Sequence, residues 1–196
     1  MEVTRLESRR LGEASDVLAR AFADDPAWTW IIPDADRRRR LLPWLFRLGF
    51  DVTAADVWAT EGAVLGAARW IPPGHASLRV GATLRAFATT PFRLRSAMGP
   101  FLSYGRAVEA MRAEAMPGPH WYLAGIGVEP GAQRQGIGAA LLRPGIEAAA
   151  LAGLPAVLLT NTAGNLSFYG RHGFEVVREG DTPENGPHAW AMVKWP

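Results

Sequence analysis

One stretch of the sequence combines glycine and polar residues in a spacing that suits phosphate binding. It runs from Gly125 to Gly138 and reads GIGVEPGAQRQGIG. The stretch follows an apolar segment and opens a helical one, so its backbone amides should converge where a helix N-terminus favours an anion. Glycine at 136 and 138 removes the Cβ atoms that would hold a phosphate away from these amides. The pattern predicts a diphosphate-binding turn.

Two familiar phosphate-binding motifs do not fit this turn. A dinucleotide-binding motif that begins at Gly136 needs a third glycine where the chain has Leu141. A P-loop that runs from Gly131 to Gly136 needs lysine next, and the residue there is Ile137. What remains is the pattern Q-x-x-G-x-G, which begins at Gln133.

A second segment, from Asn161 to Phe174, reads NTAGNLSFYGRHGF. Asn165 and Tyr169 are four residues apart, so a helix would place both on one face. Gly173 is a suitable left-handed cap for the end of that helix.

Together the two segments resemble the GNAT superfamily, whose members transfer an acetyl group from acetyl-CoA to an amine. The first resembles the pyrophosphate-binding motif of that family, and the second resembles its N-x-x-x-Y-x-x-x-G-F segment. The resemblance implies acetyl-CoA as co-substrate, no metal, and a set of cofactor-binding residues: Ile126, Gly127, Val128, Gln133, Arg134, Gln135, Gly136, Ile137, Gly138, Ala139, Asn161, Asn165 and Phe168.

By the same resemblance Tyr169 faces the thioester sulfur and is the expected catalytic acid. A phenol with a reference pKa of about 10 suits protonation of a thiolate of similar basicity. The alternative interpretation of Tyr169 is a core aromatic residue with a satisfied hydroxyl.

Within the superfamily the chain is most similar to the puromycin N-acetyltransferase-like group. The segments that carry this similarity are 22–26 (FADDP), 120–123 (HWYL) and 168–174 (FYGRHGF). That group often has glutamate before the threonine that ends the fifth strand, whereas this chain has Leu159 before Thr160. An acceptor contact or general base at that position is therefore in doubt.

The acceptor pocket of the family lies where this chain has Asp24, Asp25, Trp28 and Trp30. Carboxylates and aromatic rings together suit an ammonium group. The resemblance therefore implies that Asp24, Asp25 and Trp28 bind the substrate.

The general base is less defined, because the expected fourth strand, 121–128, has no acidic side chain. His120, at the start of this strand, has a pKa that suits a general base and is a candidate for that role and for substrate binding. The alternatives are that His120 is structural and that a chain of waters relays the proton. Glu129 lies beyond the strand and is expected to be solvated.

Hydrophobic periodicity and turn residues place the elements along the chain. Asp24, Asp25 and Pro26 should break the first helix, because proline lacks an amide and restricts the residue before it. Glu61 and Gly62 should form a hairpin turn. The expected strands cover 3–7, 56–60, 63–71, 121–128, 156–160, 174–178 and 188–195, and the expected helices cover 13–23, 36–50, one or two parts of 78–116, a segment ending near 152, and 166–172.

The fold class expected is α/β, in the mixed α+β sense. The resemblance implies a central mixed, mostly antiparallel sheet of about seven strands flanked by helices and splayed between the fourth and fifth strands. Residues 1–196 should form a single domain with a helical insertion at about 78–116.

Composition excludes several other chemistries. The chain has no cysteine, which rules out disulfides, thiolate metal sites and a cysteine nucleophile. Its four histidines lack the spacing of a metal site. A formal net charge of +2 argues against nucleic-acid binding, and the Arg37–Arg40 run is expected to be a solvated first turn or to grip nearby carboxylates. No apolar run suggests a secretion signal or a membrane span, so the expected location is cytoplasmic, as a monomer or homodimer.

Three functions remain open. The first is acetyl transfer to the primary amine of a small molecule, which the helical segment 78–116 would favour by covering the site. The second is acetylation of protein or peptide amines, which needs an open groove. The third is a CoA-binding regulatory module without catalysis, against which the presence of Tyr169 argues.

Overall fold

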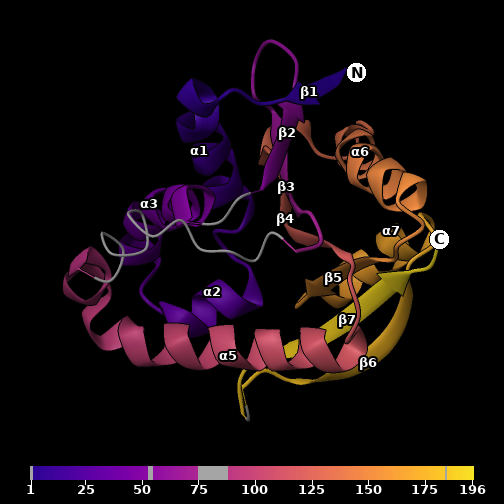
Figure 1. Cartoon of the computed structure of the whole chain (residues 1–196). Coiled ribbons are helices and arrows are strands. Elements are labelled where there is room, and N and C mark those ends of the chain that lie inside the picture. The colour runs from indigo at the N-terminus through magenta and orange to yellow at the C-terminus, as the bar shows by residue number, and fades with distance from the viewer. Residues whose placement is uncertain (1, 53–54, 75–87, 184) are drawn as a thin grey trace.

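The computed structural model describes residues 2–52, 55–74, 88–183 and 185–196. One sheet of seven strands, in the order β1-β2-β3-β4-β5-β7-β6, runs through these residues (Figure 1). Neighbouring strands are antiparallel except for β4 and β5, which are parallel. The strands are β1 (Val3–Arg5), β2 (Asp56–Thr60), β3 (Gly66–Ile71), β4 (Trp121–Val128), β5 (Ala156–Thr160), β6 (Glu175–Asp181) and β7 (His188–Lys194). The expected mixed, mostly antiparallel sheet flanked by helices is confirmed.

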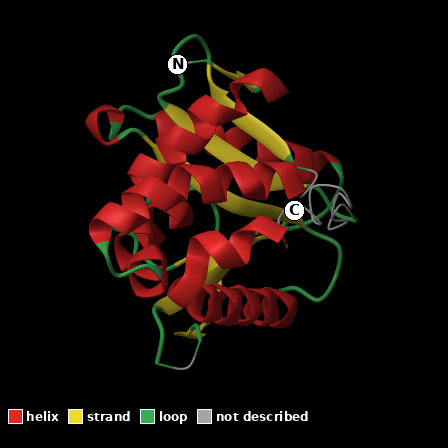
Figure 2. Ribbon diagram, turned by 90° about the vertical axis from the view of Figure 1, so that its left-hand side faces the viewer, coloured by secondary structure: helices red, strands yellow, loops and turns green. Residues whose placement is uncertain are grey.

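Helices cover both faces of the sheet (Figures 1 and 2). Helices α1 and α3 cover one face of β1–β4, and α6 packs on the opposite face. The long helix α5 lies against β5 and β7 and also contacts α2. The helices are α1 (Leu11–Ala21), α2 (Pro26–Ile31), α3 (Ala35–Val52), α5 (Met98–Ala115), α6 (Ile137–Leu151) and α7 (Leu166–Gly170).

Glycines allow the helices to approach the sheet closely. A Cβ added to Gly145 of α6 would lie 2.1 Å from the ring of Trp70, which is fully buried. A Cβ on Gly127 of β4 would lie 2.8 Å from the Cβ of Ala21 on α1. Small residues at these positions therefore bring α1 and α6 onto the two faces of the central strands.

The parallel pair β4–β5 stays together for only part of its length. Its register pairs Trp121 with Ala156 and Leu123 with Leu158, and residues 124–128 have no partner on β5. On the other edge, β4 stays paired with β3, with a bulge that leaves Ala124 as the extra residue. A bulge bends its strand and increases the local twist. The expected splay between the fourth and fifth strands is confirmed.

Several element boundaries differ from those expected. Helix α2 was not anticipated, because Asp25 caps a new helix where the sequence suggested only a break. Strand β3 begins at Gly66 instead of 63, because Thr60 accepts a hydrogen bond from the Leu65 amide and closes a longer loop than the expected two-residue turn. Within the expected insertion, residues 88–94 and α5 are helical, and 78–87 lie outside the described residues.

Among the described residues, no helix combines the length and apolar composition needed to cross a lipid bilayer.

Candidate active site

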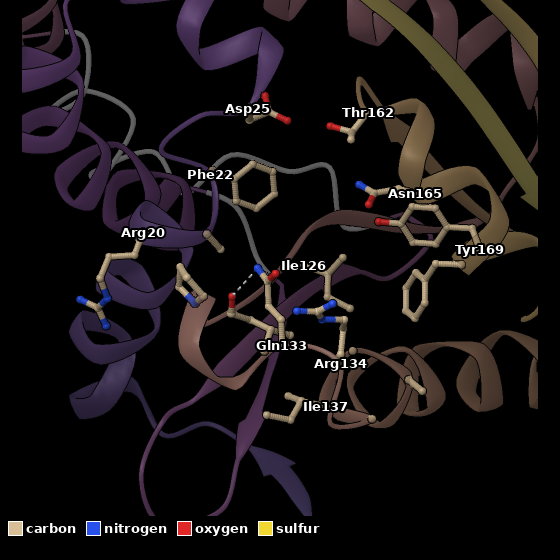
Figure 3. Close-up of a pocket in the computed structure, with 18 of the residues that line it drawn as sticks. Arg20, Phe22, Asp25, Ile126, Gln133, Arg134, Ile137, Thr162, Asn165 and Tyr169 are labelled. Atoms are coloured by element: carbon tan, nitrogen blue, oxygen red, sulfur yellow. Dashed lines mark hydrogen bonds between the residues drawn. The ribbon is translucent and has the colours of Figure 1, made fainter.

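A cleft of about 820 Å³ opens where β4 and β5 separate. Its walls are the C-terminal end of α1 with the segment before α2, the splayed half of β4, the turn before α6, and α7 (Figure 3). Most residues expected to bind the cofactor line this cleft, namely Ile126, Gly127, Val128, Gln133, Arg134, Gly136, Ile137, Gly138, Ala139, Asn165 and Phe168. Tyr169, Asp24 and Asp25 line it as well.

The N-terminus of α6 points its amides into the cleft without a side-chain cap. Gly136 occupies the cap position in the left-handed conformation, with φ of +82°, and no side chain accepts a hydrogen bond from the first turn. The first bond that closes the helix joins the Ala140 amide to the Gly136 carbonyl at 3.1 Å. The amides of residues 137–139 therefore remain available to an anion.

The two glycines of this turn have different tasks. Gly136 meets the backbone demand for a positive φ, and nothing lies within 4 Å of an added Cβ. At Gly138, by contrast, an added Cβ would lie 3.2 Å from Cζ of Phe168. The expectation that both glycines clear space for a phosphate stays a prediction, and the missing Cβ of Gly138 also accommodates the Phe168 ring.

Tyr169 places its ring in the core and its hydroxyl at the cleft (Figure 3). The residue is 6% exposed and packs edge-on against Phe168 and Phe174. No hydrogen bond to its hydroxyl occurs among the described residues, which differs from the satisfied hydroxyl of a core tyrosine. Burial raises the pKa of Tyr169 far above 10, and the nearby Asp25 carboxylate adds to the rise. The phenol therefore stays protonated at any physiological pH.

Asp25 has two separate tasks for its two carboxylate oxygens. Oδ1 accepts hydrogen bonds from the amides of Ala27 at 2.9 Å and Trp28 at 3.4 Å, which caps α2. Oδ2 has no hydrogen bond to any described residue, and the side chain borders the cleft across from Tyr169 (Figure 3). Burial raises the pKa of Asp25, and the two backbone bonds oppose part of that rise.

A buried arginine fixes the segment that carries Asp25. Arg38 on α3 is 5% exposed and donates through Nη1 to the carbonyl oxygens of Ile32 at 2.7 Å and Pro33 at 3.0 Å. Its Nε donates to the Ala23 carbonyl at 2.5 Å. The Arg37–Arg40 run was expected to be solvated or to grip carboxylates, and Arg39 pairs with Asp36 at 3.0 Å accordingly. Arg38 differs, because it mainly binds backbone carbonyls on both sides of α2.

The remaining acceptor-side residues are placed differently from expectation. Asp24 borders the cleft, but its side chain is 96% exposed and lies 3.7 Å from Arg38. Trp28 lies outside the cleft lining and packs instead against Phe46 and Phe101, between α3 and α5. Its ring therefore belongs to the apolar packing between α2, α3 and α5.

His120 is also outside the cleft, in a separate depression beside Arg112 and Tyr122. It precedes the paired end of β4, whereas the cleft lies at the splayed end. Its Nε2 lies 2.5 Å from Arg112 Nη1, and its Nδ1 lies 2.7 Å from the Gly118 carbonyl oxygen. With the arginine donating to Nε2, the network assigns the proton to Nδ1. Burial lowers the pKa of His120. Both ring nitrogens contact protein groups outside the cleft, so His120 is not placed to take a proton from an acceptor there.

Two expected cofactor residues, Gln135 and Asn161, do not line the cleft. Gln135 is exposed on the outside of the turn. Asn161 accepts a hydrogen bond from the Tyr104 hydroxyl at 2.6 Å and donates to the His188 carbonyl at 2.8 Å. It thus ties α5 to the ends of β5 and β7, a contact that spacing in the sequence does not reveal.

Sequence reasoning also missed charged groups at the cleft. Arg20 lines it and forms an ion pair with Glu129 at 2.8 Å, so Glu129 is paired and not simply solvated. Arg171 lines it and, like Arg134 of the expected cofactor set, makes no ion pair with any described residue. For Arg20 and Arg171, arginine enrichment was the only available signal, because no motif specifies an arginine at these positions. Unpaired guanidinium groups beside free helix amides suit an anionic phosphate ligand.

The sequence profile of the acetyltransferase (GNAT) family matches residues 18–174, which include every element that lines the cleft. The chain belongs to the GNAT family. It is therefore assigned to a family of acetyltransferases that use acetyl-CoA as the acetyl donor.

Solved structures of other GNAT proteins share the fold along the whole chain. An acetyltransferase from Corynebacterium glutamicum, described as histone acetyltransferase HPA2 and related, is 23% identical with a TM-score of 0.68, covering 99% of this chain and 95% of that one. The polyamine N-acetyltransferase of Drosophila melanogaster is 15% identical with a TM-score of 0.62, covering 100% and 99%. The ribosomal-protein-S18-alanine N-acetyltransferase of Escherichia coli is 16% identical with a TM-score of 0.54, covering 99% and 92%.

Proposed function

We propose that this GNAT protein transfers the acetyl group of acetyl-CoA directly to the primary amine of a small molecule. The amine nitrogen attacks the thioester carbonyl carbon, the carbon–sulfur bond breaks, and the thiolate takes up a proton. The amine loses the proton that it carried as an ammonium. The observation that carries the proposal is the cleft, which has free helix amides at one end and Tyr169 opposite Asp25 at the other.

The cofactor side of the cleft suits the donor. The amides of residues 137–139 and the guanidinium groups of Arg134 and Arg171 would hold the diphosphate. The edge of β4 from 124 to 128 has no partner on β5, so its amides are available to the pantetheine arm and to the developing oxyanion. Acetyl-CoA supplies the activated acetyl group, and the protein supplies position and charge.

The acceptor side supplies the proton transfers. Oδ2 of Asp25 would bind the ammonium and then accept its proton, directly or through a water. Tyr169 would donate its proton to the departing thiolate. Desolvation raises the pKa of both the phenol and the CoA thiol, because both ionise to anions. The pKa of the phenol therefore stays close to that of the thiol it protonates.

Helix α5 favours a small acceptor over a peptide. It crosses the acceptor face between α2 and β7, and the Tyr104–Asn161 hydrogen bond fastens it there (Figure 1). An extended peptide needs an open groove on that face. Among the fold neighbours, the Drosophila protein is a polyamine acetyltransferase, which matches this proposal, and the Escherichia coli protein acts on a ribosomal protein.

The test is a panel of small primary amines and short peptides incubated with acetyl-CoA, with release of free thiol as the readout. We expect turnover with at least one small amine and slower turnover with peptides. Thiol release with peptides only would assign the protein to the peptide class. Tight acetyl-CoA binding without any turnover would favour a regulatory module. A single domain, a cytoplasmic location and a monomeric or dimeric state are further predictions, to be checked by limited proteolysis, localisation and light scattering.

A further inference from the structure

Strand β3 carries one charged side chain among apolar neighbours, Arg69. Residues alternate between the two faces of a strand. Gly66 faces Ile137 of α6 and Trp70 faces Gly145, also of α6, so Arg69 points to the opposite face. That is the face of α1, α3 and α5, on which Asp25 and Tyr104 also lie.

The guanidinium of Arg69 has no partner among the described residues. Its Nε is fully enclosed and makes no hydrogen bond, and none of its nitrogens has a carboxylate within ion-pair distance. Of the undescribed residues, 53–54 and 75–87 contain no acidic residue, and Glu184 is the acidic one. Helix α3 lies close on this face, since a Cβ added to Gly49 would lie 3.4 Å from Nη1.

An enclosed cation without an anion is energetically unfavourable. Burial lowers the pKa of Arg69 to about 10, with Tyr122 opposing the shift, so the group keeps its positive charge at neutral pH. The arginines that stabilise this fold, such as Arg38, fill their donors with carbonyl or carboxylate oxygens. Arg69 differs from them because its donors make no hydrogen bond to any described residue.

Open space adjoins this guanidinium on the side of the cleft. The cross-strand partner of Arg69 is Gly125 on β4, and no described residue other than its chain neighbours has an atom within 4 Å of a Cβ added there. Cross-strand Cβ atoms are about 4.5–5.5 Å apart, so the space over Gly125 is directly beside the arginine. The next residue, Ile126, lines the cleft at the splay.

We propose that Arg69 and the space over Gly125 form a subsite for an oxyanion on the acceptor, so that the substrate is a small amine that also carries a carboxylate or phosphate group. A guanidinium binds either group through two parallel hydrogen bonds. The acceptor would extend from Asp25, which holds its ammonium, to Arg69, which holds its anion. This inference rests on the proposed function and specifies the class of its substrate.

The test compares amines in matched pairs that differ only in the anion. Suitable pairs are phenylalanine with phenethylamine and lysine with cadaverine for carboxylate, and phosphoethanolamine with ethanolamine for phosphate. We expect kcat/KM to be at least tenfold higher for the anionic member of one pair. The class of the preferred pair distinguishes carboxylate from phosphate.

Two variants remove the subsite by different means. Arg69→Met removes the charge, and Gly125→Val fills the space while keeping the arginine. Both should reduce the preference for the anionic member to near unity, and Arg69→Met should leave KM for acetyl-CoA unchanged. Arg47→Met, on the surface of α3, is the matched control and should keep the preference. A purely structural Arg69 would instead leave the preference intact in Arg69→Met.

A binding measurement separates this inference from the proposed function. In the CoA-bound protein, calorimetry should detect the anionic amines, and Arg69→Met should abolish that binding. If no amine releases thiol but this binding persists, the transferase proposal fails and the anion subsite stands. If thiol is released without preference for anionic amines, or if Arg69→Met keeps the preference, the subsite is disproved and the transferase proposal stands.

Discussion

At the scale of single residues, the proposed chemistry depends on two side chains from distant parts of the sequence. Tyr169 and Asp25 face each other across the cleft, and the carboxylate contributes to the raised pKa of the phenol. The raised pKa keeps Tyr169 protonated, which suits a proton donor and excludes it as a base at neutral pH. Asp25 is the acidic group whose free oxygen faces that hydroxyl.

Replacing Tyr169 with Phe tests the proton donor. The change removes only the hydroxyl, which makes no hydrogen bond to any described residue, so the core packing and acetyl-CoA affinity should persist. We expect kcat to fall by about 100- to 10,000-fold, the usual contribution of one general acid, with little change in KM for acetyl-CoA. Steady-state kinetics with pre-steady-state confirmation that chemistry limits the rate would measure this. A Phe variant with the parent rate would remove Tyr169 from the mechanism.

Asp25→Asn tests the acceptor contact without removing the helix cap. Asparagine caps helices as well as aspartate, so α2 should stay folded. KM for the amine should rise at least tenfold, while KM for acetyl-CoA stays constant. The exposed Asp24→Asn is the control and should change neither value. Equal effects of the two substitutions would contradict a specific role for Asp25.

The raised pKa of Asp25 also predicts a pH dependence. In the unfolded chain this carboxyl ionises near its usual value of about 3.9, but in the folded protein it ionises at higher pH. Between these two pKa values, Asp25 still carries its proton in the folded protein but has lost it in the unfolded chain. The contribution of Asp25 to the free energy of unfolding therefore falls as the pH rises through this window. Relative to Asp25→Asn, the wild type should lose stability from about pH 4 upward in urea titrations. A stability difference that does not change with pH would contradict the assigned shift.

At the scale of elements, two helix starts position the site, and each uses a different device. Helix α2 is capped by the side chain of Asp25, whereas α6 begins at Gly136 without any side-chain cap. The first amides of α2 donate hydrogen bonds to the Asp25 side chain. The uncapped start leaves amides for a ligand, which is why the diphosphate is assigned to α6.

The free amides of α6 are tested by Ala139→Glu. A carboxylate in the first turn of a helix favours folding through the helix dipole, but it repels a diphosphate bound there. We expect an unchanged or raised melting temperature and acetyl-CoA affinity reduced more than tenfold by calorimetry. Ala139→Gln is nearly isosteric and uncharged and should bind more tightly than the Glu variant. Equal affinity of both variants would place the phosphates elsewhere.

The segment around α2 depends on Arg38. Arg38→Met would leave the carbonyls of Ala23, Ile32 and Pro33 without their donor in a buried place. Hydrogen bonds to a charged group contribute about 1.5–3 kcal/mol each, so the loss of these three bonds should cost at least about 4.5 kcal/mol. Urea unfolding would measure it, with the exposed Arg39→Met as control. A loss below about 1 kcal/mol would show that water replaces the guanidinium.

At the scale of the whole molecule, close contact between sheet and helices holds the two halves of the cleft in register. Gly145 of α6 packs against Trp70, and Gly127 of β4 packs under α1. These contacts place the α6 amides on one side of the splayed strand and Asp25 on the other. The cleft therefore passes between β4 and β5, with the donor site and the acceptor site on opposite faces of the sheet.

Two glycines inside helices give opposite predictions for this packing. Gly145→Ala would drive a Cβ into the Trp70 ring, which lies 2.1 Å away, and should destabilise the fold by about 3 kcal/mol. Gly105→Ala on the exposed face of α5 has nothing within 4 Å and should stabilise it by about 0.5–1 kcal/mol. Chemical denaturation measures both. Equal changes would show that helix propensity outweighs packing at Gly145.

The sequence by itself determined the family, the mixed, mostly antiparallel sheet and most of the residues that line the proposed cofactor side of the cleft. These features depend on local patterns: the turn from Gln133 to Gly138 and the Asn165–Tyr169 pair lie on contiguous segments whose backbone shape follows from nearby residues. The expected strands 56–60, 121–128 and 156–160 match the structure. The same local reasoning assigned Gly138 to phosphate clearance but did not reveal that its neighbour in space is Phe168.

The tertiary structure alone decided the acceptor side. Asp25 and Asp24 are adjacent in sequence and equally acidic, yet only Asp25 is partly buried with a free oxygen at the cleft, because α2 folds back on Arg38. His120 and Trp28 have suitable chemistry, but β4 and α2 direct them elsewhere. Arg69 appeared unremarkable within an apolar strand until its unpartnered guanidinium was found beside the open space over Gly125. Burial and the absence of a partner are properties of contacts between distant segments, and no local pattern of residues encodes them.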